Sequence, residues 1–295
     1  MTTTDRAPDL TRRSLGTGRR VRNGLATGAI ALALLLAVIP LGLVVYYVIA
    51  KGAGVIDGAW FTEDIVNRAR RAGGGMQPAI VGTLVVTGAA ALMAIPLGVL
   101  GAIYLNEYGK QRPLARIVRT MADVMTGVPS IVMGLFIYVT VVLVTKSQSG
   151  FAAALALACL MLPVVIRSAE EILRLVPDEL RQASAALGAR RWRTTLTVVL
   201  PAALSGITSG SMLAIARAAG ETAPVVVTAG LTFSSTWSLF KPNTTLSMQI
   251  FSNASQPFAP AQDRAWGAAL TLVAIVLTFT VLARLISSRF AIKER

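Results

Sequence analysis

Six long stretches of this chain are almost free of charged residues, and this pattern constrains the fold more than any other feature. The stretches cover residues 25–50, 80–105, 128–145, 150–166, 205–230 and 265–286. Each is close to the ~20 residues that a helix needs to cross the hydrocarbon core of a bilayer, although the fourth is short. Strands of a membrane barrel would alternate apolar and polar residues, whereas these stretches are uniformly apolar. The sequence therefore predicts an all-α polytopic membrane protein with six transmembrane helices.

The overall composition supports a single membrane domain. Of the 295 residues, 54% are hydrophobic and only 14% are charged, whereas about a quarter of the residues in a soluble domain are charged. We expect residues 1–24 to form a basic cytoplasmic tail and residues 25–295 to form one six-helix transmembrane domain. No appended soluble catalytic domain is expected.

The positions of the basic residues predict the orientation in the membrane. Twenty Lys and Arg residues fall in the amino-terminal tail, in the loops after the second and fourth apolar stretches and at the carboxyl end, and seven fall on the opposite face. The positive-inside rule therefore places both termini in the cytoplasm. The same rule accounts for the net charge of +14 without a nucleic-acid partner. The first apolar stretch is longer than the core of a signal peptide, so we expect it to be retained as a helix.

Two residue types limit the chemistry that the chain can perform. The chain has no histidine, which excludes His-based acid–base catalysis, His metal ligands and His proton relays. Its single cysteine, Cys159, lies in an apolar stretch and cannot form an intrachain disulfide. Neither an enzymatic activity nor a metal site is expected.

The cytoplasmic loop at residues 168–203 is too long and too regularly patterned for a simple connector. Residues 170–176 predict a short helical segment. A second helix opens with two acidic residues, which interact favourably with the helix dipole, and Gly188 ends it as a C-cap. Leu200 and Pro201 are expected to break the chain before the fifth span. From the residues alone, the two short helices fit a docking surface for a partner protein and an amphipathic surface on anionic lipid headgroups equally well.

This loop resembles the cytoplasmic loop of ABC importer permeases. That family carries Glu-Ala-Ala, three residues, Gly, nine residues, Ile, one residue and Leu-Pro; this chain keeps the spacing but has Gln, Ser and Val in place of Glu, the second Ala and Ile. The resemblance implies that the residues coupling the chain to an ATPase are Gln182, Ala183, Ser184, Gly188, Leu200 and Pro201. ATP would be bound and hydrolysed by that partner subunit, so no cofactor is expected here. The chain accordingly has no Gly-x-x-x-x-Gly-Lys-Ser/Thr phosphate loop.

Two charged residues lie inside the fifth apolar stretch, where charges are costly and usually functional. Arg217 and Glu221 are four residues apart, so they share one helix face and can form a pair. A guanidinium binds tetrahedral oxyanions with two parallel hydrogen bonds, and a neighbouring carboxylate accepts a hydrogen bond from an oxyanion that still carries a proton. This arrangement favours hydrogen phosphate over sulfate; the alternative is an ion pair that only joins two helices. Gly220 and Pro224 would loosen the helix and free backbone groups to line a cavity.

A second irregular segment precedes the third span, at residues 127–130. Pro129 disfavours a regular helix through Val128, so we expect an amphipathic helix to end there and the third span to begin. Ser130 would cap the new helix and offer its hydroxyl to an anion. A kink without any ligand role fits the residues equally well.

Both segments resemble the phosphate-specific ABC permeases of the PstA type. That family has Gly-Val-Pro-Ser-Ile-Val in the third span and Arg-Ala-x-Gly-Glu-Thr-Ala-Pro in the fifth, and this chain carries both motifs, from residues 127 and 217. The similarity covers most of residues 78–224, with Gln77 in place of the family's Gly before the second span. It implies the type I ABC importer permease architecture. It also implies a substrate pathway formed by Arg217, Glu221, Thr222 and Ser130.

The resemblance further implies a function and partners. The chain would be the permease subunit of an ATP-driven phosphate importer in a bacterial-type inner membrane, working by alternating access. It would assemble with a homologous second permease, two copies of an ABC ATPase subunit and an extracytoplasmic phosphate-binding protein, within membrane lipid. A permease for another oxyanion such as molybdate or sulfate, and a stand-alone ion-driven transporter or channel, are the alternatives. The outer loop at residues 231–264 would dock the binding protein, fold as a gate or only pack at the membrane interface.

Overall fold

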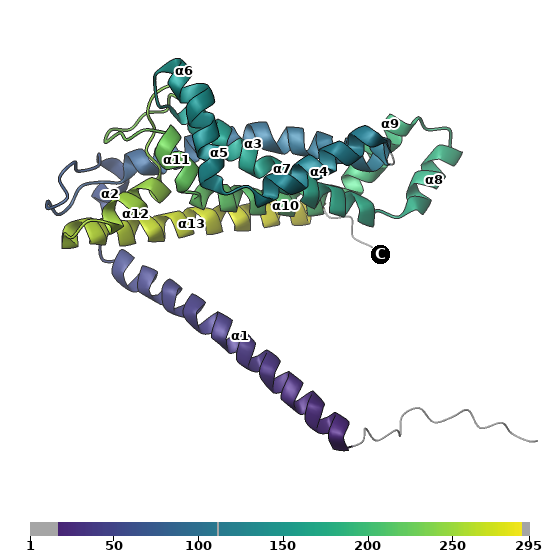
Figure 1. Ribbon diagram of the computed structural model, residues 1–295, viewed down its shortest axis with the longest axis horizontal. Coiled ribbons are helices and arrows are strands. Elements are labelled where there is room, and N and C mark those ends of the chain that lie inside the picture. The colour runs from purple at the N-terminus through teal and green to yellow at the C-terminus, as the bar shows by residue number, and fades with distance from the viewer. Residues whose placement is uncertain (1–16, 111, 291–295) are drawn as a thin grey trace, which may run out of the picture. The chain divides into compact units, whose positions relative to one another are not determined.

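The computed structural model describes residues 17–110 and 112–290, and every regular element among them is helical. The chain divides into two compact units between residues 49 and 50. The first unit holds most of α1 (Thr17–Gly52), so the end of the predicted tail is helical, while residues 1–16 lie outside the described residues. The second unit holds the other helices, labelled in Figure 1. They are α2 (Gly58–Thr62), α3 (Gln77–Ile103), α4 (Pro113–Gly127), α5 (Ser130–Ile137), α6 (Leu143–Thr145), α7 (Gly150–Leu175), α8 (Asp178–Ala186), α9 (Arg191–Thr194), α10 (Leu200–Gly220), α11 (Ala223–Thr228), α12 (Leu246–Ala254) and α13 (Ala259–Phe290).

Each predicted span has a counterpart in the described residues. Five continuous helical segments are long and apolar enough to cross a membrane: Val21–Gly52, Gln77–Gly109, Gly150–Leu175, Arg191–Gly220 and Ala259–Leu285. A sixth qualifies only as a pair, Pro113–Gly127 with Ser130–Thr145, and is bent by 105° at the break between them. The break falls where Pro129 predicts it. Wide π-helical turns lengthen or join some of these segments, at Tyr104–Gly109, Tyr138–Val142 and Thr195–Val199.

The bent pair connects opposite ends of the second unit. In Figure 1, α8 and α9 mark one end, the α8 end, and α2 and α12 mark the other, the α12 end. At the α8 end, α4 follows the π-helical turn that ends α3. After α6, the Ser149 N–H donates to the Thr228 carbonyl and the Gly150 N–H to the Lys241 carbonyl, which places this connection beside the loop that leads into α12. The pair therefore runs from one end of the unit to the other.

Two expected boundaries differ from the structure. The fourth span does not end near residue 166: α7 continues to Leu175, so the expected separate helix at 170–176 is its last part, because no helix-breaking residue intervenes. Nor does Leu200-Pro201 break the chain, since the helix is continuous from Arg191 to Gly220. A proline in a regular helix clashes with the carbonyl four residues earlier. Here the π-helical turn that precedes it, closed by the Leu200 N–H on the Thr195 carbonyl, makes room for the ring.

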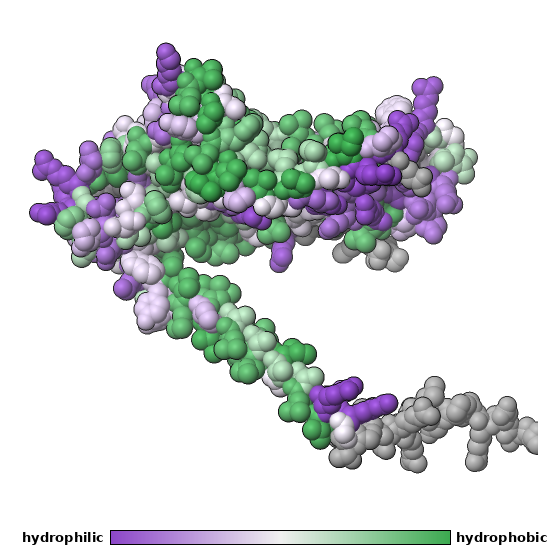
Figure 2. Space-filling view, viewed as in Figure 1, coloured by the Kyte–Doolittle hydropathy of each residue, from purple (hydrophilic) through white to green (hydrophobic). Residues whose placement is uncertain are grey.

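Small residues hold the centre of the second unit together. The main buried cluster consists largely of alanines from α3, α7 and α10, and a Cβ added at Gly98 of α3 would lie 2.6 Å from the Val165 side chain of α7. Small residues at helix interfaces let backbones approach closely, which is how helices associate in a bilayer. Large apolar side chains such as Leu92 and Leu213 face outward instead. Figure 2 shows hydrophobic surface over the middle of this unit and hydrophilic side chains gathered at the α8 end.

Candidate functional site

The helix that carries the predicted intramembrane charges is broken next to them. α10 ends at Gly220, and Glu221 is extended, with φ −69° and ψ 125°. α11 begins at Ala223 with Pro224 in its first turn. Pro224 has no N–H to continue the ladder of α10 and its ring would clash with Gly220, four residues earlier, so the chain leaves the helix between them. The irregular helix predicted from Gly220 and Pro224 is confirmed.

Arg217 and Glu221 meet at this break. The Arg217 Nε lies 3.6 Å from the Glu221 Oε1, and the two side chains are 69% and 21% exposed. The predicted pairing is confirmed, but the contact is long and the guanidinium is open to its surroundings. A mostly exposed guanidinium in an apolar segment needs water or a polar ligand around it, since hydrocarbon would leave its donors unsatisfied. This geometry fits a charge facing a water-filled pathway better than an ion pair that only joins helices.

The other two predicted pathway residues are placed less directly. Thr222 follows Glu221 in the break, half-buried, with its hydroxyl 3.5 Å from the Gly220 carbonyl. Ser130 is the first residue of α5, a helix that packs on α11; a Cβ added at Gly134 of α5 would lie 2.6 Å from the Pro224 Cα. Among the contacts of the described residues, none joins Ser130 to Arg217 or Glu221.

The predicted capping role of Ser130 is wrong. Pro129 occupies the N-cap position of α5, and no side chain bonds the helix start. Ser130 is already helical, whereas a capping hydroxyl must precede the helix to reach the N–H groups of its first turn. Those N–H groups, on Val132 and Met133, donate to the Pro129 carbonyl instead.

The outer loop contributes a helix that sequence reasoning did not place at the site. α12 is capped by the Thr245 hydroxyl, which accepts from the Met248 N–H. The Ser247 hydroxyl donates to the Glu221 carbonyl at 3.0 Å, so α12 fills one of the acceptors that the helix break leaves open. The segment Asn243–Asn253 is rich in buried polar side chains, which distinguishes it from a solvated connector. A threonine followed by apolar residues was the one sequence signal for this helix start.

α8 has the form predicted for the start of the cytoplasmic loop. Asp178 and Glu179 lie in its first turn. At its end Gly188 has φ +76°, and the Ala189 N–H donates to the Ser184 carbonyl while the Gly188 N–H donates to the Ala185 carbonyl. These two bonds are the pattern of a Schellman motif, which needs a left-handed residue at the position of Gly188. The predicted C-cap is therefore confirmed.

The surface of α8 is open. No residue of α8 is buried, and the residues of the loop motif are divided in exposure: Gln182, Ala183, Gly188 and Pro201 are exposed, and Ser184 and Leu200 are half-buried. Ser184 contributes its hydroxyl to a hydrogen bond with the Thr194 hydroxyl at 2.8 Å, which ties α8 to α9. Leu180 and Leu187 are 44% and 89% exposed. An exposed apolar face at the end of a membrane protein fits a partner surface.

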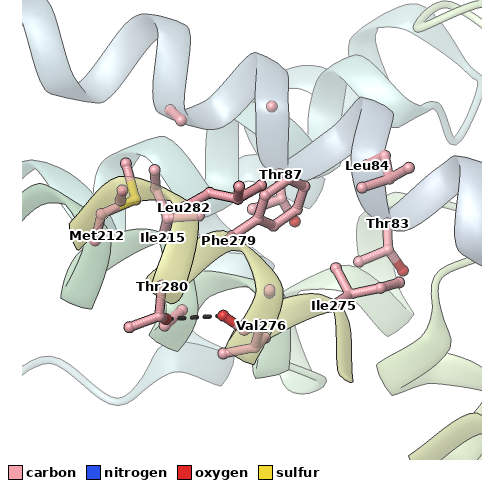
Figure 3. Close-up of a pocket in the computed structure, with 15 residues that line it drawn as sticks. Thr83, Leu84, Thr87, Met212, Ile215, Ile275, Val276, Phe279, Thr280 and Leu282 are labelled. Atoms are coloured by element: carbon pink, nitrogen blue, oxygen red, sulfur yellow. Dashed lines mark hydrogen bonds between the residues drawn. The ribbon is translucent and has the colours of Figure 1, made fainter. Parts of the chain in front are cut away.

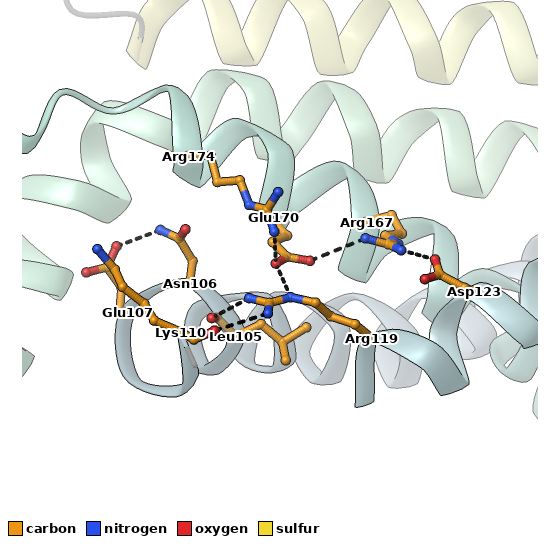
Figure 4. A network of polar contacts seen from close by, with 9 residues as sticks. All are labelled: Leu105, Asn106, Glu107, Lys110, Arg119, Asp123, Arg167, Glu170 and Arg174. Carbon is orange, nitrogen blue, oxygen red and sulfur yellow. Dashed lines mark hydrogen bonds and ion pairs between the residues drawn. The ribbon is translucent and has the colours of Figure 1, made fainter. Parts of the chain in front are cut away.

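Two groups of charges stabilise the α8 end, and sequence spacing does not predict the pairs that join different helices. In the first, Arg181 of α8 bonds the buried Glu107 carboxylate. In the second, the buried carboxylate of Glu170, on α7, accepts from the Arg119 Nε at 2.7 Å and the Arg174 Nη2 at 2.6 Å. Figure 4 shows the second group, with Arg167 reaching from Glu170 towards Asp123. Partners 51 or 74 positions apart share no sequence spacing that would identify them.

A separate apolar cavity lies among α3, α10 and α13. It measures about 380 Å³, and Figure 3 shows Thr83, Ile215 and Phe279 among the side chains around it. None of its lining residues is charged, and Arg217 is not among them. An oxyanion has no counter-charge there, so this cavity is not the site for an anionic substrate.

Comparison with known proteins supports the interpretation of these features. Residues 94–292 match the model of a family described as binding-protein-dependent transport system inner membrane component. The chain is 43% identical to phosphate transport system permease protein PstA 1 of Mycobacterium tuberculosis (strain CDC 1551 / Oshkosh), over 96% of this chain and 93% of that protein. It is 39% identical to phosphate transport system permease protein PstA of Yersinia pestis, over 98% of this chain and 99% of that protein.

Solved structures share the architecture at low sequence identity. A chain of the MetNI methionine ABC transporter, in an inward-facing conformation, superposes with a TM-score of 0.58 at 18% identity, covering 73% of this chain and 94% of that one. A chain of a bacterial ABC transporter involved in the import of the acidic polysaccharide alginate superposes with a TM-score of 0.57 at 13% identity, covering 93% and 100%. These similarities establish the fold, which is that of a type I ABC importer permease.

Proposed function

This chain belongs to the binding-protein-dependent transport system inner membrane components, and within them to the phosphate transport system permease proteins, and we propose that it forms one half of the pathway by which an ATP-driven importer carries inorganic phosphate across the membrane. The observation that carries the proposal is Arg217, a largely exposed guanidinium in an apolar helix, beside a helix break and a carboxylate. The chain is a transporter subunit and not an enzyme.

The chemistry of the break fits hydrogen phosphate. The Arg217 guanidinium offers paired donors to a tetrahedral oxyanion. The Glu221 carboxylate, held 3.6 Å from it, is an acceptor for the proton that hydrogen phosphate retains near neutral pH. Sulfate and molybdate carry no proton under these conditions, so the same carboxylate repels them. Thr222 adds a hydroxyl in the same break, and Ser130 adds one at the start of the neighbouring α5.

The energy for transport would come from a partner subunit. The exposed face of α8, closed by the Schellman motif at Gly188, supplies the docking surface for an ABC ATPase. We infer a complex of this chain with a homologous second permease, two copies of the ATPase and an extracytoplasmic phosphate-binding protein. ATP stays on the ATPase, and this chain carries no cofactor of its own. The α8 end then faces the cytoplasm and the α12 end faces the outside of a bacterial-type inner membrane, with both termini cytoplasmic.

Transport would follow from alternating access around the break. Closure of the two ATPases moves α8, and through it the helices that flank Arg217. Phosphate released by the binding protein meets the guanidinium from the α12 end and leaves when the α8 end opens. A ligand held by one loose guanidinium is bound weakly enough to leave again, which conduction through a pathway requires.

Phosphate uptake by the reconstituted complex tests the proposal. Arg217→Gln is expected to abolish uptake while the ATPase still co-purifies, because the variant removes the charge but leaves α8 unchanged. Arg217→Lys, which keeps the charge without the planar fork, should retain a small fraction of uptake. Leu213→Ala, one turn away on the same helix and also exposed, is the control and should transport normally. Full uptake by Arg217→Gln would contradict the proposal.

Substrate choice is tested with Glu221→Gln. In the unaltered complex a large excess of sulfate should leave phosphate uptake unchanged. In Glu221→Gln the amide can donate to an unprotonated oxyanion, so sulfate should compete measurably. If sulfate competes equally well with both complexes, Glu221 does not select for the protonated oxyanion and the molybdate or sulfate alternative gains support.

A further inference from the structure

α8 is held in place by polar contacts, chiefly those of one arginine, and not by burial. None of its residues is buried, yet its Arg181 side chain is only 16% exposed and makes five hydrogen bonds. Two of them, at 2.9 and 3.2 Å, reach the Glu107 Oε1. Two more reach the Leu173 and Val176 carbonyls at the end of α7, and the fifth joins Asp178 within α8. The position of α8 therefore depends on Glu107 as well as on the end of α7 and on α9.

Glu107 lies just beyond α3, in the π-helical turn that continues this helix. Its side chain is 6% exposed, and the Asn106 amide donates to the same oxygen at 2.8 Å. Arg191, the first residue of α9, donates to the Glu107 carbonyl and stacks over the Tyr108 ring. Both short helices of the cytoplasmic loop are thus fastened to the same turn at the end of α3, by charge-assisted hydrogen bonds that are among the stronger ones in proteins.

α3 is suited to carry a movement along its length. The helix is continuous from Gln77 through Gly109, with Pro96 in its interior, and the buried residues near Pro96 are small ones that pack on α7. The distance along its axis from Glu107 to Thr83 is about 36 Å at 1.5 Å per residue. The close packing of α3 on α7 along this length, where a Cβ added at Gly98 would lie 2.6 Å from the Val165 side chain, is what would carry a displacement of the turn at Glu107 towards Thr83.

The far end of α3 holds α12. The Thr83 hydroxyl accepts from the Leu246 N–H at the start of α12. A Cβ added at Gly82 would lie 1.9 Å from the Thr244 carbonyl, so the backbones of α3 and the α12 segment are in direct contact. α12 in turn reaches the helix break through Ser247, whose hydroxyl donates to the Glu221 carbonyl.

We propose that Glu107 and Arg181 are positioning residues that couple α8 to α3, so that movement of α8 by the ATPase is passed along α3 to α12 and to the substrate break at Glu221. The proposal rests on the proposed function, since it assumes that an ATPase docks on α8. In the proposed function, α8 moves the helices that flank Arg217 directly, through α9 and α10. The route through α3 is a second one, and it connects the α8 end to the outer side of the pathway. The route begins at the contact of Arg181 with Glu107 and ends at the contact of Ser247 with the Glu221 carbonyl.

The test compares ATP hydrolysis with phosphate uptake in proteoliposomes that contain the complete complex. Glu107→Gln keeps an acceptor but removes the charge that holds Arg181. We expect uptake to fall roughly 5- to 10-fold, while the ATPase remains bound and hydrolyses ATP at the unaltered rate, so that more ATP is consumed per phosphate. Arg181→Gln should behave in the same way, and the double variant should be no worse than either single one, since all three break one linkage.

Asp178→Asn is the matched control. It removes another partner of Arg181, on α8 itself and 68% exposed, and leaves the bond to α3 intact. It should therefore show unaltered uptake and unaltered ATP use. A loss in Asp178→Asn equal to that in Glu107→Gln would overturn the proposal, because Arg181 would then act only within α8.

A second measurement detects movement of α12, the last element of this relay from α8 through α3. In a Cys159→Ala background, a cysteine in place of Phe251, an exposed α12 residue, is expected to react with a maleimide at different rates with and without vanadate-trapped ATP. Glu107→Gln should abolish this difference. A difference that persists in Glu107→Gln, or that is absent from the background complex, would contradict the relay. If the background complex transports no phosphate at all, the proposed function itself fails, which is a separate result.

Discussion

At the scale of single residues, the charges of this chain divide by burial into two kinds. Arg217 is largely exposed and meets Glu221 at 3.6 Å. Glu170 is 1% exposed and lies within 2.7 Å of two guanidiniums, those of Arg119 and Arg174. A charge that must exchange ligands cannot be fully bonded to fixed partners, whereas a buried carboxylate persists only when it is paired with an opposite charge. Under the proposed function Arg217 serves transport, whereas Glu170 holds α4 and α7 together.

Glu170→Gln is therefore expected to destabilise the protein without touching the pathway. The variant leaves Arg119 without its carboxylate between α4 and α7, and removing one partner of a buried pair costs on the order of 3 kcal/mol. The midpoint of thermal unfolding in detergent should fall by several degrees. Asp123→Asn removes a 52% exposed carboxylate from the same group and should change the midpoint little. Equal shifts for both variants would show that burial does not set the importance of these charges.

The sequence was informative about the contact of Arg217 with Glu221 and uninformative about that of Glu170 with Arg119, for one reason. Arg217 and Glu221 are four positions apart in one apolar run, so helix geometry alone predicts their contact. Glu170 meets Arg119 across 51 positions, and that contact depends on how α4 packs on α7. Predicting α7 to end before Glu170 also placed this acid in the loop and hid its burial. Ser130 was misjudged at a finer level, by the one position that separates a capping residue from the first helical residue.

At the scale of elements, the local signals of glycine and proline were mostly sufficient. Gly188 ends α8, Pro129 precedes α5, and Gly220 with Pro224 interrupts the fifth span. Pro201 is the exception, because a π-helical turn absorbs it. Such a turn has no sequence signature of its own, since any residue can enter it. The buried helix α12 was also missed, because its polar residues are typical of a surface loop. Its burial depends on contacts with Thr83 and Glu221, which are distant in the sequence.

Gly188→Ala tests whether the end of α8 must be left-handed. Nothing lies within 4 Å of a Cβ at this position, so the change adds strain at φ +76° without a clash. The strain is about 1 kcal/mol, and we expect α8 to fray and ATPase co-purification to weaken. Gly188→Asn should retain the ATPase, because Asn adopts the left-handed conformation more readily. Equal retention by Gly188→Ala and Gly188→Asn would mean that the Schellman motif is dispensable for docking.

Gly82→Ala tests the close approach between α3 and the α12 segment. Its Cβ would lie 1.9 Å from the Thr244 carbonyl, a backbone atom that cannot rotate away. We expect α12 to be displaced, with a lower unfolding midpoint and reduced phosphate uptake. Gly88→Ala lies on the same helix with nothing within 4 Å of its Cβ, and should leave both properties unchanged. Indifference to Gly82→Ala would show that the two segments can separate without consequence.

At the scale of the whole molecule, the bent pair α4–α5 decides the topology. Among the described residues, the second unit holds four of the continuous apolar segments, and the first two of them, α3 and α7, both run towards the α8 end, so the pair between them returns the chain to the α12 end. It also carries the chain from the turn fastened to α8 to the connection that bonds residues 228 and 241. The six predicted spans thus follow from apolar length, whereas the 105° bend and the side-by-side packing of α5 and α11 follow only from tertiary contacts.

This topology predicts opposite labelling at the two ends of the second unit. Phe240 and Leu187 are 77% and 89% exposed, so each can be replaced by cysteine for labelling in a Cys159→Ala background. Phe240 precedes α12 and Leu187 follows α8. With intact cells, a membrane-impermeant maleimide should label the cysteine at position 240 and not the one at 187. After permeabilisation it should label both, and tags at the two termini should become accessible together with position 187, because basic residues concentrate at that end. Labelling of position 187 in intact cells would reverse the orientation. An amino-terminal tag that is accessible in intact cells while position 187 is not would mean that α4–α5 re-enters the membrane without crossing it, because the pair lies between that terminus and position 187.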